Sequence, residues 1–334
     1  MRRIRQCGGF ITPMIALIFF MVCLSGCGGE RVTPEEKNKA LATRFWQEGW
    51  TQEGRTVFDQ ICAPDLINHD PNMPGVTDLE TYKDHVALHV AAFPAVGGVT
   101  IDDIVAQGDG VAVRWTWSVT HEGEYMGIPP TGDRLTMTGI TFHRFLEGRV
   151  AENWHQYDTM GFLQQLSAAP PMGREDFTWG RPMESGAGAG GDPEVNVAIY
   201  RREAEELWNA KDLEVVEQIF SDNFVNHDPA WPGVTDRANF KAWAAGWLKA
   251  APDMELVIED IVAQGDKVAG RWTARWTDVA GMGGTTPTGK EIVVTGMDIC
   301  SIADGKIAER WWAKDILGAM QQMGVIPPVE GDGQ

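Results

Sequence analysis

The chain has 334 residues, 28 of them Lys or Arg and 47 Asp or Glu, which gives a formal net charge of −19 at pH 7. This length predicts about two domains, each long enough to bury a core of its own. The acidic balance argues against nucleic acids and anionic membrane surfaces as partners, because both carry negative charge.

The N-terminus has the pattern of a secretory signal. Three arginines precede an apolar stretch over 15–24, which is too short to span a bilayer. The stretch ends in Leu-Ser-Gly-Cys, which resembles the lipobox of bacterial lipoproteins and implies that Cys27 is lipidated once 1–26 is removed. A short uncleaved anchor is the alternative. We expect a lipid-anchored protein of the bacterial cell envelope that faces the periplasm or the exterior, with Gly28 favouring the outer membrane.

The remainder of the chain contains an internal sequence repeat. The six residues IVAQGD stand at 104–109 and return at 261–266. The stretch NHDPNMPGVTD at 68–78 returns as NHDPAWPGVTD at 226–236. The offset is 158 residues in the second pair and 157 in the first, which is far longer than a solenoid repeat. This pattern indicates a duplicated domain.

In copy 1 the apolar residues recur first at the spacing of a helix and then at every second position, as in a strand. The helical periods cover residues 35 to about 49, 56–61 and 79 to about 93. The alternating periods cover 99–106, 110–120, 134–146 and 149–157, and a short last helix covers 161–166. This order predicts an α+β fold in which three N-terminal helices pack on a curved antiparallel sheet.

Copy 2 repeats the same order of elements. We therefore expect domain 1 at 35–166 and domain 2 at 194–326. The segment 167–193 between them is rich in Pro and Gly and has no apolar period, which is typical of a linker.

Three stretches carry a resemblance to a known family. They are NHDP at 68–71, HEGEYMGIPPTG at 121–132 and ENWHQYDTMGFLQQL at 152–166. They resemble the SnoaL-type polyketide cyclase and ester cyclase family, which has the cone-shaped fold of nuclear transport factor 2. The resemblance implies ring closure by an intramolecular aldol reaction, in which a carboxylate takes a proton and neither metal nor cofactor is needed.

The family's catalytic Asp lies three residues before the Asp that opens the last helix. That last-helix residue is Asp158 here, and His155 stands where the family has its carboxylate. A His can act as a base near neutral pH. Strand parity places His155 and Tyr157 on one face, and Thr141 and His143 share a face of the neighbouring strand. The candidate catalytic residues are therefore His155, His143, Tyr157 and Asp158, although Asp158 also has the plain role of a helix cap.

Further residues are candidates for contact with a substrate. The resemblance places His69 near the mouth of the pocket, and His121 stands at the turn into the GIPPTG loop, which would line the rim. The candidate substrate-binding residues are His69, His121, Met126, Ile128, Trp117 and Thr141.

A metal site is not expected. His85 and His89 are four apart on the third helix, but no Glu stands between them in an HExxH arrangement, so a structural pair is favoured. Cys62 and Cys300 could form a disulfide between the copies, but two unpaired buried thiols are the favoured interpretation.

Copy 2 keeps only one of these histidines, His227, and has Trp312 where copy 1 has His155. We therefore interpret copy 2 as chemically degenerate and expect its sheet to pair with that of copy 1 within the chain, with or without further oligomerisation. The expected function is binding of a small apolar, carbonyl-bearing molecule, with cofactor-free acid/base chemistry of the cyclase or isomerase type in domain 1. The alternative is a non-catalytic lipoprotein that binds a ligand or another protein.

Overall fold

The computed structural model of the protein describes residues 32–94, 99–169, 191–281 and 285–327. The expected signal segment, the expected lipidation site Cys27 and most of the expected linker lie outside these ranges. Residues Thr33–Gln334 form one compact unit. No helix in the described ranges is long and apolar enough to cross a membrane.

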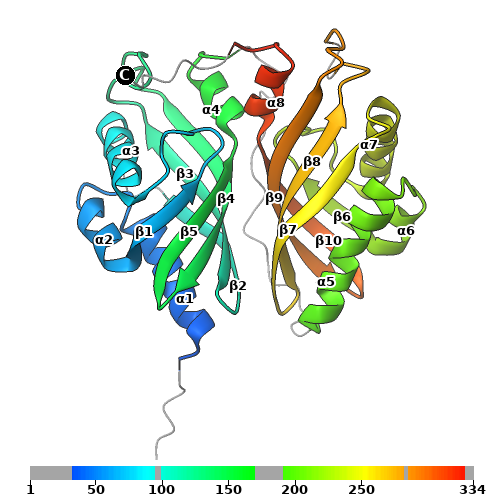
Figure 1. The fold of residues 1–334 in the computed structure, drawn as a ribbon, viewed down its shortest axis with the longest axis horizontal. Helices are drawn as coiled ribbons and strands as arrows, with labels where there is room; N and C mark the ends of the chain where they lie inside the picture. The colour runs from blue at the N-terminus through cyan, green and yellow to red at the C-terminus, as the bar shows by residue number, and fades with distance from the viewer. Residues whose placement is uncertain (1–31, 95–98, 170–190, 282–284, 328–334) are drawn as a thin grey trace, which may run out of the picture. The chain divides into compact units, whose positions relative to one another are not determined.

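Domain 1 begins with helices and continues with strands, as the periods predicted. Its elements are α1 (Pro34–Gln47), α2 (Gly54–Ile61), β1 (Cys62–His69), α3 (Leu79–Ala92), β2 (Val99–Gln107), β3 (Gly110–Thr120), β4 (Arg134–Leu146), β5 (Arg149–Tyr157) and α4 (Thr159–Gln165). The helices cover one face of the sheet (Figure 1).

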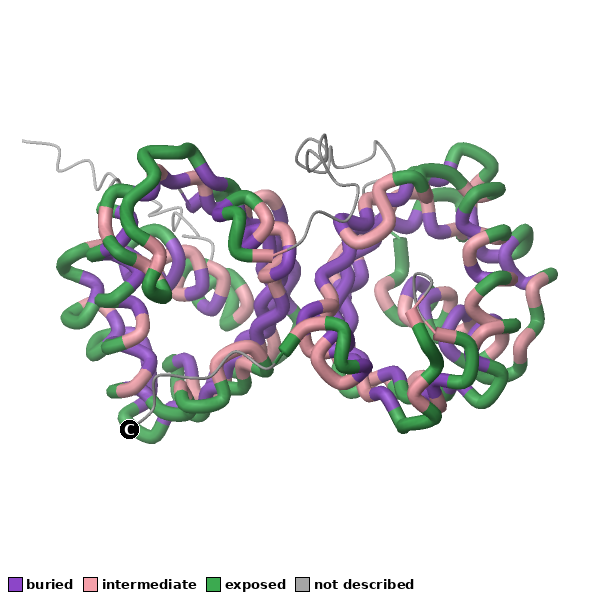
Figure 2. The backbone as a smooth tube through the Cα atoms, turned by 90° about the horizontal axis from the view of Figure 1, so that it is seen from above, coloured by how far each residue is buried: buried purple, intermediate pink, exposed green. Residues whose placement is uncertain are grey.

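Domain 2 repeats this order with one difference in the first helix. Its elements are α5 (Pro193–Arg202), the π-helix η1 (Glu203–Asn209), α6 (Val215–Ile219), β6 (Phe220–His227), α7 (Arg237–Ala250), β7 (Glu255–Gln264), β8 (Lys267–Thr277), β9 (Glu291–Ala303), β10 (Lys306–Lys314) and α8 (Ile316–Gln322). In both copies the outer helices alternate between buried and exposed residues (Figure 2).

The sheet of each copy has one strand more than the sequence predicted. Its order is β1-β5-β4-β3-β2 in domain 1 and β6-β10-β9-β8-β7 in domain 2. The strand that was missed, β1 or β6, lies at the edge and is parallel to β5 or β10, whereas the other pairs are antiparallel. In domain 1 this strand carries Pro64 and a register irregularity, and such a segment is typical of a sheet edge. NHDP is therefore the end of this strand and the turn after it.

Local sequence signals explain where the helices and turns lie. Asp78 accepts a hydrogen bond from the Thr81 amide and completes a capping box at the start of α3. Gly108 and Gly265 both have φ of +60°, which favours glycine at the turn after each IVAQ strand. The doubled IVAQGD thus encodes one strand end and one tight turn in each copy.

The outer faces of the two sheets pack on each other. Their contact is an apolar cluster of Val105, Ala112, Ile140, Phe142, Val262, Ala269, Met297, Ile299, Trp311 and Ala313. Equivalent hydrogen bonds cross it in both directions: the Ala263 amide donates to the Gln107 side chain at 2.9 Å, and the Ala106 amide donates to Gln264 at 3.4 Å. Such a self-complementary contact is the arrangement of a two-fold dimer, here within one chain.

Candidate functional site

His155 lies on the inner face of the domain 1 sheet and belongs to a hydrogen-bond network there. The Thr141 hydroxyl accepts a hydrogen bond from Trp115 Nε1 at 3.0 Å and lies 3.0 Å from His155 Nδ1. The hydroxyl therefore donates its own proton to Nδ1, which leaves the proton of a neutral His155 on Nε2. Burial lowers the pKa of His155 to about 3, so the ring is neutral at pH 7.

His143 lies on the same face, two residue pairs along the β4–β5 ladder from Thr141 and His155. Its Nδ1 donates to Asn153 Oδ1 at 2.7 Å, so the lone pair of the neutral ring is on Nε2. Burial lowers its pKa to about 4. Strand parity therefore predicted correctly that both histidines face the interior, but their hydrogen bonds make His143 the proton acceptor and His155 the donor.

Asp70 is the group that the sequence analysis missed. Tyr157 donates its hydroxyl proton to Asp70 Oδ2 at 3.0 Å, and the Asn72 amide donates to Oδ1 at 2.9 Å. Burial raises the pKa of Asp70 to about 7, and the negative charge of Asp315 adds to this rise. The signal was present in the sequence, because NHDP occurs in both copies, but it was interpreted as a turn.

His69 does not lie in the interior of the cone. Its ring stacks on Trp154 with centroids 4.8 Å apart and planes 7° apart, and its Nε2 lies 3.2 Å from Glu152 Oε2. The guanidinium of Arg271 from domain 2 also lies over the Trp154 ring, 4.6 Å from its centroid. His227 stacks on Trp311 in the same way. The contact between the sheets thus accounts for the presence of this His in both copies.

The remaining candidates of domain 1 are spread over the rim and the core. His121 is fully buried and contacts the Thr131 amide and hydroxyl at 3.3 Å, so it organises the loop from within. Met126 is exposed on that loop and has a φ of +51°, and Ile128 pairs with Tyr125 there. Trp117 is buried against Trp50, with centroids 5.7 Å apart.

Asp158 acts as a cap in this structure. Its carboxylate accepts a hydrogen bond from the Gly161 amide at 3.0 Å at the start of α4. Asp315 does the same for the Gly318 amide, at 2.7 Å, at the start of α8.

His85 and His89 have partners that suit a structural pair. Their ring centroids are 4.2 Å apart, His89 Nδ1 lies 3.1 Å from the His85 carbonyl oxygen, and His89 Nε2 lies 3.1 Å from the Tyr125 hydroxyl. Within the described ranges no three His, Cys, Asp or Glu side chains gather in a way that could hold a metal ion. Cys62 and Cys300 are each free and buried.

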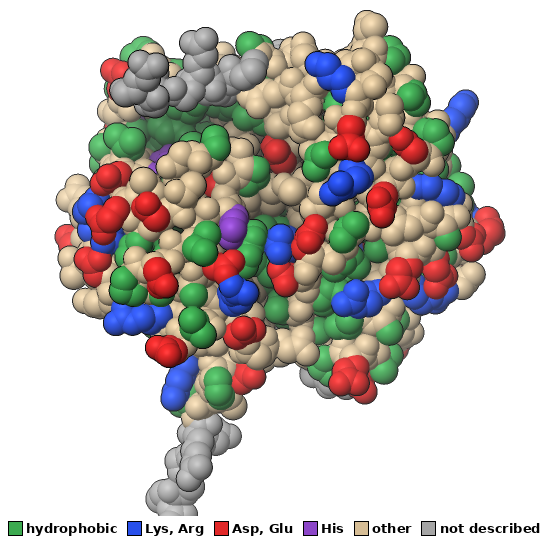
Figure 3. Space-filling view, viewed as in Figure 1, with side chains coloured by type: hydrophobic (Ala, Val, Ile, Leu, Met, Phe, Trp, Pro, Cys, Tyr) green, Lys and Arg blue, Asp and Glu red, His purple; other side chains and the backbone are tan. Residues whose placement is uncertain are grey.

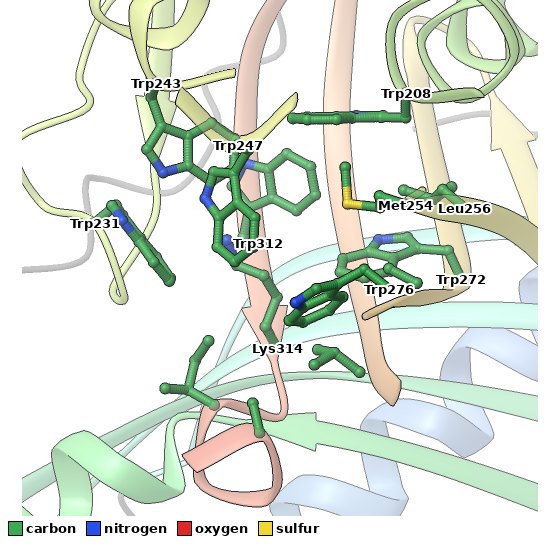
Figure 4. Close-up of a pocket in the computed structure, with 14 residues that line it drawn as sticks. Trp208, Trp231, Trp243, Trp247, Met254, Leu256, Trp272, Trp276, Trp312 and Lys314 are labelled. Carbon is green, nitrogen blue, oxygen red and sulfur yellow. The ribbon is translucent and has the colours of Figure 1, made fainter. Parts of the chain in front are cut away.

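Domain 2 contains a cavity whose aromatic lining the sequence analysis did not predict. An inner chamber of about 70 Å³ is almost entirely apolar and is lined by seven tryptophans together with Met254, Leu256 and Lys314 (Figure 4). An outer chamber of about 290 Å³ shares four of these indoles and is also lined by Gly246. The tryptophans are Trp208, Trp231, Trp243, Trp247, Trp272, Trp276 and Trp312.

The cavity replaces the histidines of copy 1 by indoles at matching positions. In copy 2, Trp243 and Trp247 of α7 stand where α3 has His85 and His89, and Trp312 stands where β5 has His155. Copy 2, which the sequence analysis interpreted as chemically degenerate, thus has an aromatic cavity at positions where copy 1 has histidines.

One ammonium group stands among these indoles. Lys314 Nζ lies 4.8 Å from the ring centroid of Trp312, 5.1 Å from that of Trp231 and 5.4 Å from that of Trp243. These are distances at which a cation is attracted to an aromatic face. The ammonium also pairs with the carboxylate of Asp228, which is 3% exposed. Lys314 and Asp228 are the counterparts of Tyr157 and Asp70 in domain 1.

A buried charge cluster lies behind the tryptophan wall. Arg310 pairs with Glu203 on the π-helix and with Asp298, whose Oδ2 lies 3.1 Å from Arg310 Nε. Trp208 Nε1 donates to Glu203 at 3.2 Å, and Trp272 Nε1 donates to Asp298 at 3.1 Å. Burial raises the pKa of Asp298 to about 6. The cluster therefore anchors both indole N–H groups and turns their carbon faces toward the cavity.

Comparison with known protein families gives a match in each copy. The family model for SnoaL-like polyketide cyclases matches residues 40–166 and 198–323. No curated protein matches the chain.

Solved structures resemble single copies of the repeat. A SnoaL-like protein from Jannaschia sp. CCS1 is 23% identical, covering 43% of this chain and all of its own, with a TM-score of 0.39. A polyketide-cyclase-like protein from Acidithiobacillus ferrooxidans is 33% identical, covering 40% of this chain and 96% of its own, with a TM-score of 0.36. IdmH from Streptomyces antibioticus is 30% identical, covering 39% and 98%, with a TM-score of 0.35. Because the family model matches both copies, the chain belongs to the SnoaL-like polyketide cyclase family and carries its domain twice.

Proposed function

We propose that domain 2 binds a small apolar molecule carrying a carbonyl oxygen in its tryptophan-lined cavity. The observation that carries this proposal is the composition of the cavity wall, in which indole faces surround a single ammonium. Aromatic faces offer large contact areas to a flat apolar body. An apolar pocket with a few placed polar groups is the usual form of a small-molecule site.

Two groups in the cavity can donate a hydrogen bond to such a ligand. Lys314 has three N–H donors, and Asp228 is its one carboxylate partner among the described residues. Trp243 Nε1 is buried and has no hydrogen-bond partner within the described ranges. A carbonyl oxygen between these atoms would satisfy an N–H group whose isolation costs free energy. On the face shown in Figure 3 the acidic and basic side chains are interspersed, so we expect the cavity itself to select the ligand.

Tryptophan fluorescence tests this proposal directly. The full mature chain, with Cys27 replaced, is titrated with apolar carbonyl compounds such as 2-naphthaldehyde, and saturable quenching is the expected result. Trp312→His installs the copy 1 residue and should weaken binding at least about tenfold, because it removes an aromatic wall. Lys249→Ala, on the exposed side of α7, is the matched control and should bind like the unchanged chain. Quenching that persists in Trp312→His would place the ligand elsewhere.

A second candidate function, cofactor-free acid/base chemistry in domain 1, has its own supporting observation. Asp70 has a pKa raised to about 7, which suits a proton acceptor at neutral pH, and Tyr157 lies beside it. His155 presents an Nε2 proton that has no partner within the described ranges, so it can donate to an oxyanion. We therefore assign Asp70 as the base, with His155 and Tyr157 as donors.

Turnover separates this second function from binding alone. Asp70→Asn should abolish proton exchange at the carbon next to the carbonyl of a bound ligand, as followed by deuterium uptake. His155→Gln should lower the rate about a hundredfold and leave Asp70 in place. If Asp70→Asn exchanges deuterium like the unchanged chain, domain 1 has no role in such chemistry.

We also propose that Cys27 is lipidated and anchors the chain in the cell envelope. The basic start, the apolar stretch and the Leu-Ser-Gly-Cys sequence support this proposal. Labelling of growing cells with an alkyne fatty acid should mark the unchanged chain but not Cys27→Ser. Equal labelling of both would exclude Cys27 as the site.

A further inference from the structure

Lys314 is the nucleophilic amine of the domain 2 cavity, and its surroundings fit a covalent role. The amine lies among the faces of Trp231, Trp243 and Trp312 and contacts the carboxylate of Asp228. Lysine amines attack carbonyl carbons to form imines, and buried lysines serve this reaction in many enzymes. We propose that Lys314 forms an imine with a carbonyl ligand held in this cavity, an inference that rests on the binding function above.

The electrostatics of the cavity favour the product of this step. A protonated imine carries its positive charge at Nζ, where the ammonium carried its charge before. The three indole faces and Asp228 therefore attract the iminium as they attract the ammonium. The amine has to be neutral only for the step in which it attacks the carbonyl carbon. The site thus stabilises the covalent state without any rearrangement of its charges.

Asp228 lies where a proton shuttle is needed. The ammonium gives one proton to the Asp228 carboxylate, and the neutral amine then attacks the carbonyl carbon. A second proton moves from nitrogen to oxygen as the carbinolamine forms, and Asp228 returns its proton to the hydroxyl that leaves as water. One ammonium and one carbonyl group give one iminium ion and one water molecule, and the carboxylate is regenerated.

The cavity wall also protects such an imine. Imines hydrolyse in water, and an apolar chamber of about 70 Å³ has little room for water beside a ligand. Domain 1 has no equivalent chemistry at this place, because Tyr157 stands at the position of Lys314 and offers a phenol to Asp70. The two copies of one fold would then perform different chemistry with one carboxylate position in common.

Reductive trapping tests the imine. The full mature chain with Cys27 replaced is incubated with 2-naphthaldehyde and sodium cyanoborohydride, digested and analysed by mass spectrometry. We expect the peptide that contains Lys314 to gain the mass of the probe less one oxygen atom, with saturation at the concentration that saturates fluorescence quenching. Lys249, exposed on α7, is the internal control for unspecific labelling and should react linearly with probe concentration.

Two variants complete the test. Lys314→Arg keeps a charged hydrogen-bond donor but has no primary amine, so it should lose labelling at this peptide at every probe concentration, including those that saturate its own quenching. Asp228→Asn removes the proton acceptor and should slow labelling about a hundredfold, with the rate compared at probe concentrations that saturate the quenching of each protein. Quenching together with no labelling at Lys314 beyond the level at Lys249 overturns the imine and leaves the binding function intact. An absence of both quenching and labelling overturns both.

Discussion

Lys314 and Asp228 form a buried ion pair at the positions where domain 1 joins Tyr157 to Asp70 by a hydrogen bond. The carboxylate stands at the end of the same edge strand in both copies, and only its partner has changed. A phenol beside a carboxylate with a raised pKa suits proton transfer, whereas an ammonium among indoles suits binding and imine formation. The duplicated scaffold therefore keeps one acidic position and differs in the group that faces it.

The first prediction concerns the loss of folding stability when this ion pair is broken. Lys314→Met leaves the Asp228 carboxylate buried without a counter-charge, so we expect the free energy of unfolding to fall by about 3–5 kcal/mol. Lys314→Tyr installs the domain 1 partner and should cost less, because the phenol can donate to Asp228. Urea denaturation of the three proteins measures the difference. Equal losses in both variants would mean that the carboxylate does not need its partner.

The second prediction uses two equivalent ion pairs that differ in burial. Asp103 accepts from Arg114 Nε at 2.9 Å and also pairs with Lys267 across the sheets, with a side chain 1% exposed. Its counterpart Asp260 accepts from Arg271 at 3.1 Å but is 49% exposed. Asp103→Ala should lower the free energy of unfolding by about 3 kcal/mol, since it removes the nearer of two carboxylates from the buried Arg114 guanidinium, the other being Asp102 at 3.6 Å.

Asp260→Ala is the matched control for that variant. An exposed pair contributes less than about 1 kcal/mol, so this substitution should be nearly silent in the same denaturation experiment. A small loss in Asp103→Ala as well would show that the contact between the sheets does not depend on this network.

The third prediction concerns pH and Asp70. Its pKa is about 7 in the folded chain, above the ordinary value of 3.8, so the folded state binds the proton more tightly. The stability that this provides is present below about pH 4 and is lost as the pH rises through 7, with a slope of at most about 1.4 kcal/mol per pH unit.

Asp70→Asn removes this dependence. Asp298, whose pKa is also raised, titrates in both proteins and cancels in the difference. Unfolding free energies measured from pH 4 to 8 should therefore fall more steeply for the unchanged chain than for Asp70→Asn. Parallel curves would contradict the raised pKa of Asp70.

Much of this fold was predictable because its signals are local. Strand β4 alternates between exposed and buried residues at both of its ends, and the turn at Gly108 follows from its Gly-Asp dipeptide. Strand β1 was missed because its pairing with β5 is non-local and its sequence, with Pro64 and Asn68, is typical of a loop. Edge strands of this kind depend on their neighbours more than on their own period.

The site was less predictable than the fold. Parity placed His155 and His143 on the inner face correctly, but it could not show that Thr141 and Asn153 fix their protons in opposite ways. The aromatic lining of the domain 2 cavity was missed because Trp312 was interpreted only as the loss of His155. Only the assembled fold shows that α7, β8 and β10 turn their tryptophans toward one space.

The last prediction concerns the entrance to the cavity. Gly246 lies in the middle of α7, where an added Cβ would meet nothing within 4 Å, and it lines the outer chamber. Domain 1 has Leu88 at the equivalent position, 70% exposed. Gly246→Leu should raise the free energy of unfolding by about 0.5–1 kcal/mol, because glycine is a poor helix former. It should also weaken ligand binding, since the new side chain occupies the entrance. Gly246→Ala is the control, because it should give most of the gain in stability with little added bulk. Fluorescence titration should therefore show weaker ligand binding only for Gly246→Leu. Equal affinity in both variants would mean that ligands do not enter beside α7.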